Sequence, residues 1–243
     1  MPASSSISVL AAKPDCGRHP GIAAYSAPTV PFPAHRFNSA MIVATDPGSP
    51  LDMTANLPLP ARTGHFRYES GHHGDYWLDL DAIFADPRFT NIRAQTLVEM
   101  IGPFAPDVVC GPMTGGALLA QFVALHCGCG FAWTERVVAS EGSVRYELPR
   151  GQIEVVEGRT VVIVDDVINA GSAAAKTHGA LTAARAAPVA IAALLLLGNA
   201  IDTFAHASDI DILALERRAS NLWLADDCPH CAAGVPLDSV GPA

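Results

Sequence analysis

Basic residues are scarce in this sequence. Its 243 residues include 15 Lys and Arg against 24 Asp and Glu, which gives a formal net charge of -9. A chain with this balance has no general electrostatic attraction for nucleic-acid phosphates or for anionic lipid. Nucleic-acid and membrane partners are therefore not expected. An anionic ligand would have to be held locally, by backbone amides, a few arginines and a metal.

The sequence shows no pattern typical of a membrane span, a secretory leader or a disulfide framework. The longest apolar run, residues 186–197, contains Pro188 and is shorter than the ~18 residues of a membrane span, so we expect a buried strand there. Residues 1–12 have neither a basic start nor a sustained apolar core, so no signal peptide is predicted. Six cysteines in a chain of this length do not indicate a secreted disulfide scaffold, and a reducing cytoplasmic setting is expected.

The composition predicts one main globular domain with appendages. Hydrophobic residues make up 50% of the chain and charged residues 16%, which is typical of a well-filled interior. Residues 1–59 are rich in Ala, Ser and Pro and lack periodicity, so we expect them to be disordered, and Met41 is an alternative start to Met1. The main domain is expected over residues 60–227, followed by a tail at 228–243.

From Asp107 onward, short apolar runs alternate with helical patterns, which predicts an α/β fold with a doubly wound, mainly parallel sheet. Residues 64–87 are aromatic and rich in His and Gly, and we expect them to form a separate cap. Residues 137–157 are polar and lie between two strands, so a mobile active-site loop is predicted. The expected strands are 107–110, 131–134, 160–164, 189–197 and 211–215, and the expected helices are 91–101, 116–126 and 172–185.

The most informative motif is TVVIVDDVINAGSA at residues 160–173. A buried strand runs into Asp165 and Asp166, and a turn of small residues then leads into a helix. Ligands of parallel sheets bind outside the carboxyl ends of the strands, and the amides that open a helix bind phosphate. Two carboxylates beside a phosphate site can accept hydrogen bonds from ribose hydroxyls. They can also stabilise positive charge that develops on the sugar. Periodicity alone leaves open an ordinary strand-end Asp pair before a capped helix.

This segment resembles the signature with which type I phosphoribosyltransferases bind 5-phosphoribosyl 1-diphosphate (PRPP). No Walker loop and no GxGxxG motif competes with it. The similarity extends over residues 64–237 and is greatest to the orotate phosphoribosyltransferases. GHFRYESGHH at 64–73 resembles their hood, CGPMTGGA at 110–117 resembles their pyrophosphate loop, and TER at 134–136 with LPRG at 148–151 resembles their catalytic loop. CPHCAAGVPL at 228–237 resembles the tail of some bacterial members.

The resemblance implies a type I phosphoribosyltransferase fold with a small N-terminal hood. It also implies Mg²⁺-dependent transfer of the phosphoribosyl group from PRPP to a nucleobase, with orotate as the expected base, in a cytoplasmic homodimer. The implied catalytic residues are Asp165 and Asp166, which also reach the metal indirectly through PRPP-bound Mg²⁺, together with Arg136 and Arg150. The implied pyrophosphate loop is Gly111, Pro112, Met113, Thr114, Gly115 and Gly116; the 5'-phosphate loop is Asn169, Ala170, Gly171, Ser172 and Ala173; the base-side residues are His72, His73 and Asn199.

Three departures from the family pattern concern the base and the leaving group. Arg136 is followed by two valines, and no lysine occurs between Lys13 and Lys176, although orotate enzymes usually have lysines in this loop. Asn199 lies in the place where the family commonly has an Arg for the orotate carboxylate, and Glu69 stands where several members have Lys. A different or neutral base therefore stays possible, as does a PRPP-binding regulator without turnover.

Several cysteines and histidines have more than one interpretation. Cys228 and Cys231 with His230 could bind zinc, and the pair Cys127 and Cys129 could complete four sulfur ligands. The spacing of that second pair is not that of a zinc knuckle, so a reduced tail that docks on the core is the favoured interpretation. His72 and His73 could contact the base or a phosphate, or could be solvated loop histidines.

Overall fold

The computed structural model describes residues 60–238. The predicted disorder of residues 1–59 and the last five residues of the tail lie outside this range. The strands are β1 (Ala61–Arg67), β2 (His73–Leu78), β3 (Val108–Pro112), β4 (Gly130–Val138), β5 (Val144–Glu147), β6 (Thr160–Ile168), β7 (Ala187–Leu197) and β8 (Asp211–Arg218). The helices are α1 (Asp81–Ala85), α2 (Pro87–Ile101), α3 (Gly115–Cys127), α4 (Arg150–Val156), α5 (Ser172–Ala183), α6 (Ala200–Ser208) and α7 (Pro229–Ala232).

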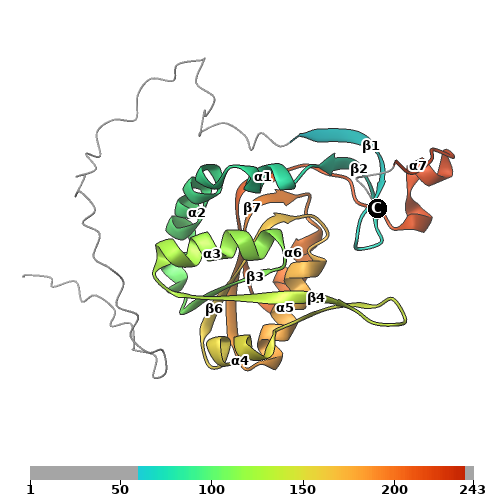
Figure 1. Ribbon diagram of the computed structural model, residues 1–243. Helices are drawn as coiled ribbons and strands as arrows, with labels where there is room; N and C mark the ends of the chain where they lie inside the picture. The colour runs from blue at the N-terminus through green and yellow to red at the C-terminus, as the bar shows by residue number, and fades with distance from the viewer. Residues whose placement is uncertain (1–59, 239–243) are drawn as a thin grey trace, which may run out of the picture. The chain divides into compact units, whose positions relative to one another are not determined.

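A six-stranded sheet forms the centre of the described chain. Its strand order is β5-β4-β3-β6-β7-β8, and every neighbouring pair is parallel except β4 with β5. Helices α2 and α3 lie over one face, and α5 and α6 lie over the other (Figure 1). Parallel sheets need both faces covered, because helical crossovers return the chain across each face. The predicted doubly wound α/β fold is confirmed.

Strand β6 shows why its sequence is continuously apolar. Val162 and Val164 pack in the core cluster under α2 and α3, while Val161 and Ile163 pack in the cluster under α5 and α6. All four side chains are fully buried. Successive residues of a strand face opposite sides, so a strand covered on both faces has no polar position in its middle. Between residues 60 and 238, no helix combines the length and the apolar character needed to cross a membrane.

Several elements extend beyond their predicted ends. Strand β6 continues to Ile168 because Asp165 and the residues after it still pair with β7, so the two carboxylates lie within the end of the strand. Helix α2 begins at Pro87, where Asp86 accepts a hydrogen bond from the Arg88 amide at 3.0 Å. An Asp N-cap followed by Pro is a strong helix start, because Pro needs no hydrogen-bond partner in the first turn.

Residues 137–157, expected to be a loop, instead contain a hairpin and a helix. Strand β4 continues to Val138 and pairs with β5 in an antiparallel register that places Val138 opposite Val144. Gly142 forms the turn with a φ of 86°, and α4 follows. The hairpin extends well past the rest of the sheet (Figure 1). The mobility of this segment stays a prediction.

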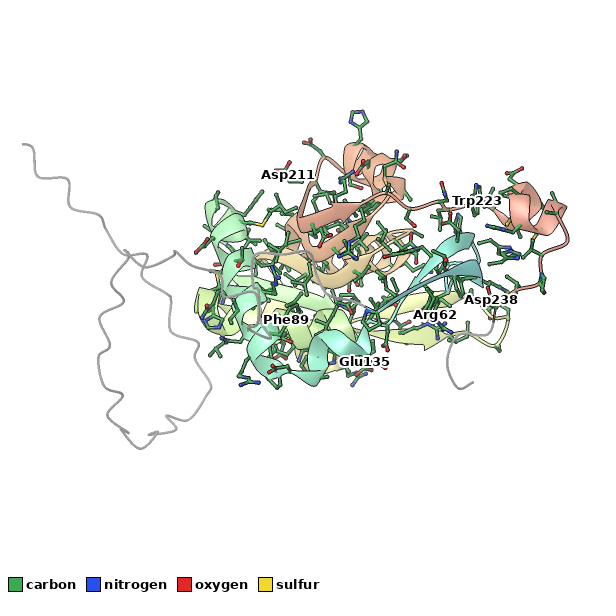
Figure 2. All side chains as sticks on the ribbon, turned by 90° about the horizontal axis from the view of Figure 1, so that it is seen from above. Arg62, Phe89, Glu135, Asp211, Trp223 and Asp238 are labelled. Carbon is green, nitrogen blue, oxygen red and sulfur yellow. The ribbon has the colours of Figure 1, made fainter. Side chains whose placement is uncertain are left out.

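The predicted hood is a separate antiparallel hairpin of β1 and β2. The C-terminal segment, defined here as residues 223–238, docks on this hairpin rather than on the sheet core. Two backbone hydrogen bonds of 2.8 Å join His73 to Trp223, and the Asp238 amide donates to the His65 carbonyl oxygen at 2.7 Å. Figure 2 labels Trp223 and Asp238 beside the hairpin. The two ends of the described chain therefore form one structural unit.

Candidate functional site

The carboxylates of Asp165 and Asp166, called the acid pair below, are buried at the end of β6. Their side chains are 7% and 8% exposed. The Asp166 amide donates to Asp165 Oδ1 at 3.0 Å, and the Val167 amide donates to Asp166 Oδ1 at 2.9 Å. Burial raises the pKa of both carboxyl groups, and the charge of Asp166 raises that of Asp165 further. The folded protein is therefore less stable when these carboxyl groups are ionised. Carboxyl pKa values shifted in this way are typical of functional sites.

The glycine loop, residues 111–116, rests directly against the acid pair. A Cβ atom on Gly115 would lie 2.1 Å from Asp166 Oδ2, and one on Gly116 would lie 2.7 Å from Asp165 Oδ1. The peptide bond between Met113 and Thr114 is cis. Because β3 and β6 are neighbouring parallel strands, the loop after one meets the end of the other. Together they line a cavity of about 620 Å³.

The predicted 5'-phosphate loop, residues 169–173, forms the turn between β6 and α5. Gly171 is the N-cap of α5 with a φ of 74°, and a Cβ atom there would lie 2.2 Å from Ile201 Cδ1. Glycine is therefore required both by the backbone conformation and by the space. The first amides of a helix have no partner within the helix and attract anions. Ala173 lines the same cavity as the acid pair, so these amides lie beside it.

The two predicted catalytic arginines occupy different surroundings. Arg136 on β4 forms an ion pair with Glu69 at the tip of the hood hairpin. Glu69 lines the acid-pair cavity, so Arg136 lies at its edge, with its charge already partnered. Arg150 is exposed at the start of α4 and is not among the described residues that line this cavity. The structure thus brings Arg136 to the site and leaves Arg150 outside it.

Tyr146 is a site residue that sequence reasoning missed. It lies on β5 directly opposite Arg136 and lines the acid-pair cavity. Burial, followed by the charges of Glu69 and Asp165, raises its pKa to about 12. The phenol therefore stays protonated at neutral pH and can donate a hydrogen bond to an anion. Tyr146 reaches the cavity because this segment forms a hairpin where a loop was predicted, and no motif marked the residue.

A second cavity of about 650 Å³ adjoins the first. Both are lined by Glu69, Leu80, Asp81 and Val167. The second cavity adds aromatic and apolar surface from Tyr68, Tyr76, Trp77 and Leu197. It also adds the amide of Asn169 and the charged side chains of Arg62 and Asp79. A flat heterocyclic ring suits walls of this kind, because aromatic side chains stack on it and a few polar groups orient it.

Of the three expected base-side residues, His72 and Asn199 line one cavity and His73 lies apart from them. His73 contacts His65 and Cys231, in a cluster described below. His72 is half-buried, lies 3.1 Å from the Ser70 hydroxyl, and lines a cavity of about 540 Å³ with Asn199. The adjacent residues His72 and His73 therefore have different surroundings, because His73 begins strand β2 while His72 stays in the turn.

Two arginines near Asn199 were also missed. Arg217 and Arg218 end β8 and line a cavity of about 940 Å³ with Asn199 and Tyr76. The parallel register of β7 and β8 places Arg218 beside Leu197, two residues before Asn199. The positive charge expected at position 199 therefore comes from the next strand, β8. Arg218 binds Glu216 at 2.5 Å, and Arg217 binds Asp202 at 3.0 Å, so both charges have partners.

A comparison with protein families decides what this arrangement is. The Phosphoribosyl transferase domain family matches residues 81–221, which is more than half of the chain. The match includes the glycine loop, the acid pair and the 5'-phosphate loop. The chain belongs to the phosphoribosyltransferase family. It is an enzyme of the glycosyltransferase type and most resembles the orotate phosphoribosyltransferases.

Known relatives of this phosphoribosyltransferase agree with that assignment. Orotate phosphoribosyltransferase of Wolinella succinogenes is 30% identical over 182 residues, which cover 70% of this chain and 86% of the relative. The protein of the same name from Heliobacterium modesticaldum is 30% identical over 184 residues, covering 73% and 89%. The crystal structure of orotate phosphoribosyltransferase from Aeropyrum pernix covers 65% of this chain and 87% of its own, with a TM-score of 0.52. At 20% identity, it shows the fold alone.

Proposed function

We propose that this phosphoribosyltransferase transfers the 5-phosphoribosyl group of PRPP to orotate, giving orotidine 5'-monophosphate and pyrophosphate. One observation carries the proposal. The glycine loop at the start of α3 packs against the buried acid pair at the end of β6, with the start of α5 beside them. Two sets of helix-opening amides thus flank two carboxylates, which matches a sugar with a phosphate at one end and a diphosphate at the other.

Each part of PRPP has a place along this edge of the sheet. The 5'-phosphate binds the amides of residues 169–173, and the diphosphate binds the glycine loop. The ribose hydroxyls donate hydrogen bonds to Asp165 and Asp166, because ionised carboxylates only accept them. The base occupies the aromatic cavity lined by Tyr68 and Tyr76, which adjoins the acid-pair cavity.

The reaction follows from these positions. A base nitrogen forms a bond to C1' and gives up its proton to the departing pyrophosphate, while the bond from C1' to the diphosphate oxygen breaks and its electron pair leaves with pyrophosphate. Positive charge develops on the ribose during this exchange, and the fixed carboxylates of the acid pair stabilise it. The Tyr146 phenol and the Arg136 guanidinium lie where they can donate hydrogen bonds to the leaving group.

The donor set of the first cavity fits Mg²⁺. Its lining includes the carboxylates of Asp165, Asp166, Asp81 and Glu69, and Mg²⁺ prefers oxygen ligands. Without a cation, these four acids would repel a diphosphate. Asp165 and Asp166 would hold the ion indirectly, through bound PRPP. When bound, Mg²⁺ neutralises charge on the diphosphate.

Orotate as the base is supported by the curated relatives, which are orotate phosphoribosyltransferases. An anionic base also needs positive charge nearby. Arg217 and Arg218 supply it beside Asn199, in a cavity that shares Tyr76 with the aromatic cavity. They replace the Arg that the family commonly carries at the position of Asn199.

The direct test is a panel of bases. Purified protein is incubated with Mg²⁺, PRPP and orotate, uracil, adenine or hypoxanthine in turn, and release of pyrophosphate and nucleotide is measured. Orotate is expected to give the highest kcat/KM. Turnover with another base instead of orotate would show that the substrate is that base. No turnover with any base would rule out the proposed enzymatic activity.

A second candidate is a PRPP-binding regulator with weak or no catalysis. The ion pair of Arg136 with Glu69 favours it, because the leaving-group arginine is already partnered and no lysine occurs between Lys13 and Lys176. Calorimetry would then show PRPP binding in a protein that turns over none of the bases. A homodimer, expected from the family resemblance, is tested separately by light scattering.

Glu69→Gln is predicted to lower the KM for PRPP by up to about 5-fold. In the wild type, Arg136 must leave Glu69 before it can bind the diphosphate, and a half-exposed ion pair of this kind contributes at most about 1 kcal/mol. Steady-state kinetics with varied PRPP measures the change. In a variant that already carries Arg136→Gln, the further change Glu69→Gln should not lower the KM for PRPP. A higher KM in Glu69→Gln alone would mean that Glu69 contacts the substrate or its metal.

A further inference from the structure

Four side chains with soft or imidazole ligand atoms meet outside the substrate cavities. They are His65 and His73 of the hood hairpin and Cys228 and Cys231 of the C-terminal segment. One ligand atom from each lies within 4.8 Å of all the others. His65 is 163 residues from Cys228 in sequence. The fold therefore assembles a set of two thiols and two imidazoles from opposite ends of the described chain.

Four distances within this cluster are close to those of a tetrahedral site. Zn–N bonds of about 2.05 Å and Zn–S bonds of about 2.3 Å give ligand separations of about 3.3 Å between nitrogens and about 3.5 Å between nitrogen and sulfur. His65 Nε2 lies 2.9 Å from His73 Nδ1 and 3.4 Å from Cys228 Sγ. Cys231 Sγ lies 3.7 Å from His65 Nε2 and 3.3 Å from His73 Nδ1. A small displacement of each side chain would admit one ion.

The orientation of His65 is fixed by a backbone contact. Its Nδ1 lies 2.8 Å from the Val235 carbonyl oxygen, which can only accept a hydrogen bond. Nδ1 therefore carries the proton, and the lone pair of Nε2 faces the two thiols and His73. Metal-binding histidines are commonly oriented in this way by a carbonyl or carboxylate on the opposite ring nitrogen.

The ligand types and their burial select among possible ions. His65, His73 and Cys228 are buried and Cys231 is exposed, so three of the four ligands would be shielded from water. Thiolate and imidazole ligands in a tetrahedral arrangement suit zinc, whereas Mg²⁺ takes oxygen ligands. Cys228 and Cys231 are separated by two residues, a spacing that recurs in zinc sites. The pair Cys127 and Cys129, considered from the sequence, is not part of the cluster.

We infer that His65, His73, Cys228 and Cys231 bind one structural zinc ion, which fastens the C-terminal segment to the hood hairpin. An isolated two-stranded hairpin is marginally stable in water, and a metal clip between distant segments offsets this. The turn of this hairpin carries Tyr68 and Glu69 to the substrate cavities. An effect of the zinc ion on catalysis rests on the proposed function, whereas the binding of zinc does not.

The test measures metal content in the full-length protein. Reduced, untagged protein is loaded with ZnCl₂, dialysed against buffer without chelator, and analysed by plasma mass spectrometry together with a Cys228→Ser/Cys231→Ser variant. About one zinc per chain is expected in the wild type, and less than about a tenth of that in the variant. Cys127→Ser/Cys129→Ser and His230→Ala are matched controls from outside the ligand set, and both should retain the wild-type zinc content.

Cobalt absorption provides an answer that does not depend on how well the variants fold. Co²⁺ bound to wild-type protein is expected to show the visible and sulfur charge-transfer bands of a tetrahedral site with two thiolates, and Zn²⁺ should abolish them. Absence of zinc and of these bands in reduced wild-type protein, or equal zinc in the double Ser variant, would overturn the proposal. A stoichiometric metal other than zinc would overturn the identity of the ion. Bound zinc in a protein that transfers nothing to any base would instead contradict the proposed function alone.

Discussion

Replacing Asp165 and Asp166 together by Asn is expected to lower kcat/KM by at least ~10²-fold without lowering the melting temperature. The loss follows because amides neither stabilise positive charge on the ribose nor hold Mg²⁺ through PRPP. Stability should not fall because the pKa of both carboxyl groups is raised in the fold. An acid whose folded pKa lies above its unfolded value destabilises the protein when ionised. This cost begins to decrease as pH falls through the folded pKa and is gone below the unfolded pKa.

The double variant is therefore expected to melt at the same or a higher temperature than wild type at pH 7, and the difference should shrink as the pH is lowered. Pyrophosphate release and scanning calorimetry measure the two quantities. Asp211→Asn, an exposed change at the start of β8 (Figure 2), is the control and should alter neither. Wild-type activity in the double variant would show that these acids are not at the ribose.

Gly115→Ala is expected to lower kcat/KM by roughly 10²-fold, because displacement of reacting groups by about 1 Å can cost that much. The new methyl group would lie 2.1 Å from Asp166 Oδ2, so the glycine loop or the carboxylate must move. Either movement separates the diphosphate site from the ribose site. Steady-state kinetics, with circular dichroism to confirm folding, measures the effect.

Gly179→Ala is the matched control for this substitution. Gly179 lies within α5, and a Cβ atom there would meet no atom within 4 Å. Alanine in a helix interior is favoured over glycine by up to about 1 kcal/mol, so stability should rise slightly and activity should not change. Equal activity of Gly115→Ala and Gly179→Ala would mean that close contact between the loop and the acid pair is not needed for turnover.

The sheet and half of the site could be predicted from the sequence because their signals are local. Strand β6 is covered on both faces, so its apolar run ends where the acid pair and the small-residue turn begin. The loop after β3 is marked in the same way by a strand followed by glycines. Both loops lie at the carboxyl edge of neighbouring parallel strands, and this rule alone predicts that they meet.

The remaining features depend on pairing between segments far apart in sequence. Tyr146 reaches the acid-pair cavity because β5 folds back on β4, and the polar composition of residues 137–157 indicated a loop. Arg218 reaches the base side through the register of β7 with β8. The ligand cluster needs His65 and His73 from the hairpin beside Cys228 and Cys231, and no spacing rule connects them. Asp86 and Pro87 are a local signal for the start of α2, whereas the apolar periodicity begins only at residue 91.

The claim that PRPP lies along the carboxyl edge of the sheet is tested most directly by a crystal structure of the protein soaked with Mg²⁺ and PRPP. Electron density is expected for the 5'-phosphate at the turn of residues 169–173, for the ribose hydroxyls at Asp165 and Asp166, and for the diphosphate at the glycine loop. Density for PRPP at any other place, with these three groups free of it, would contradict this binding position.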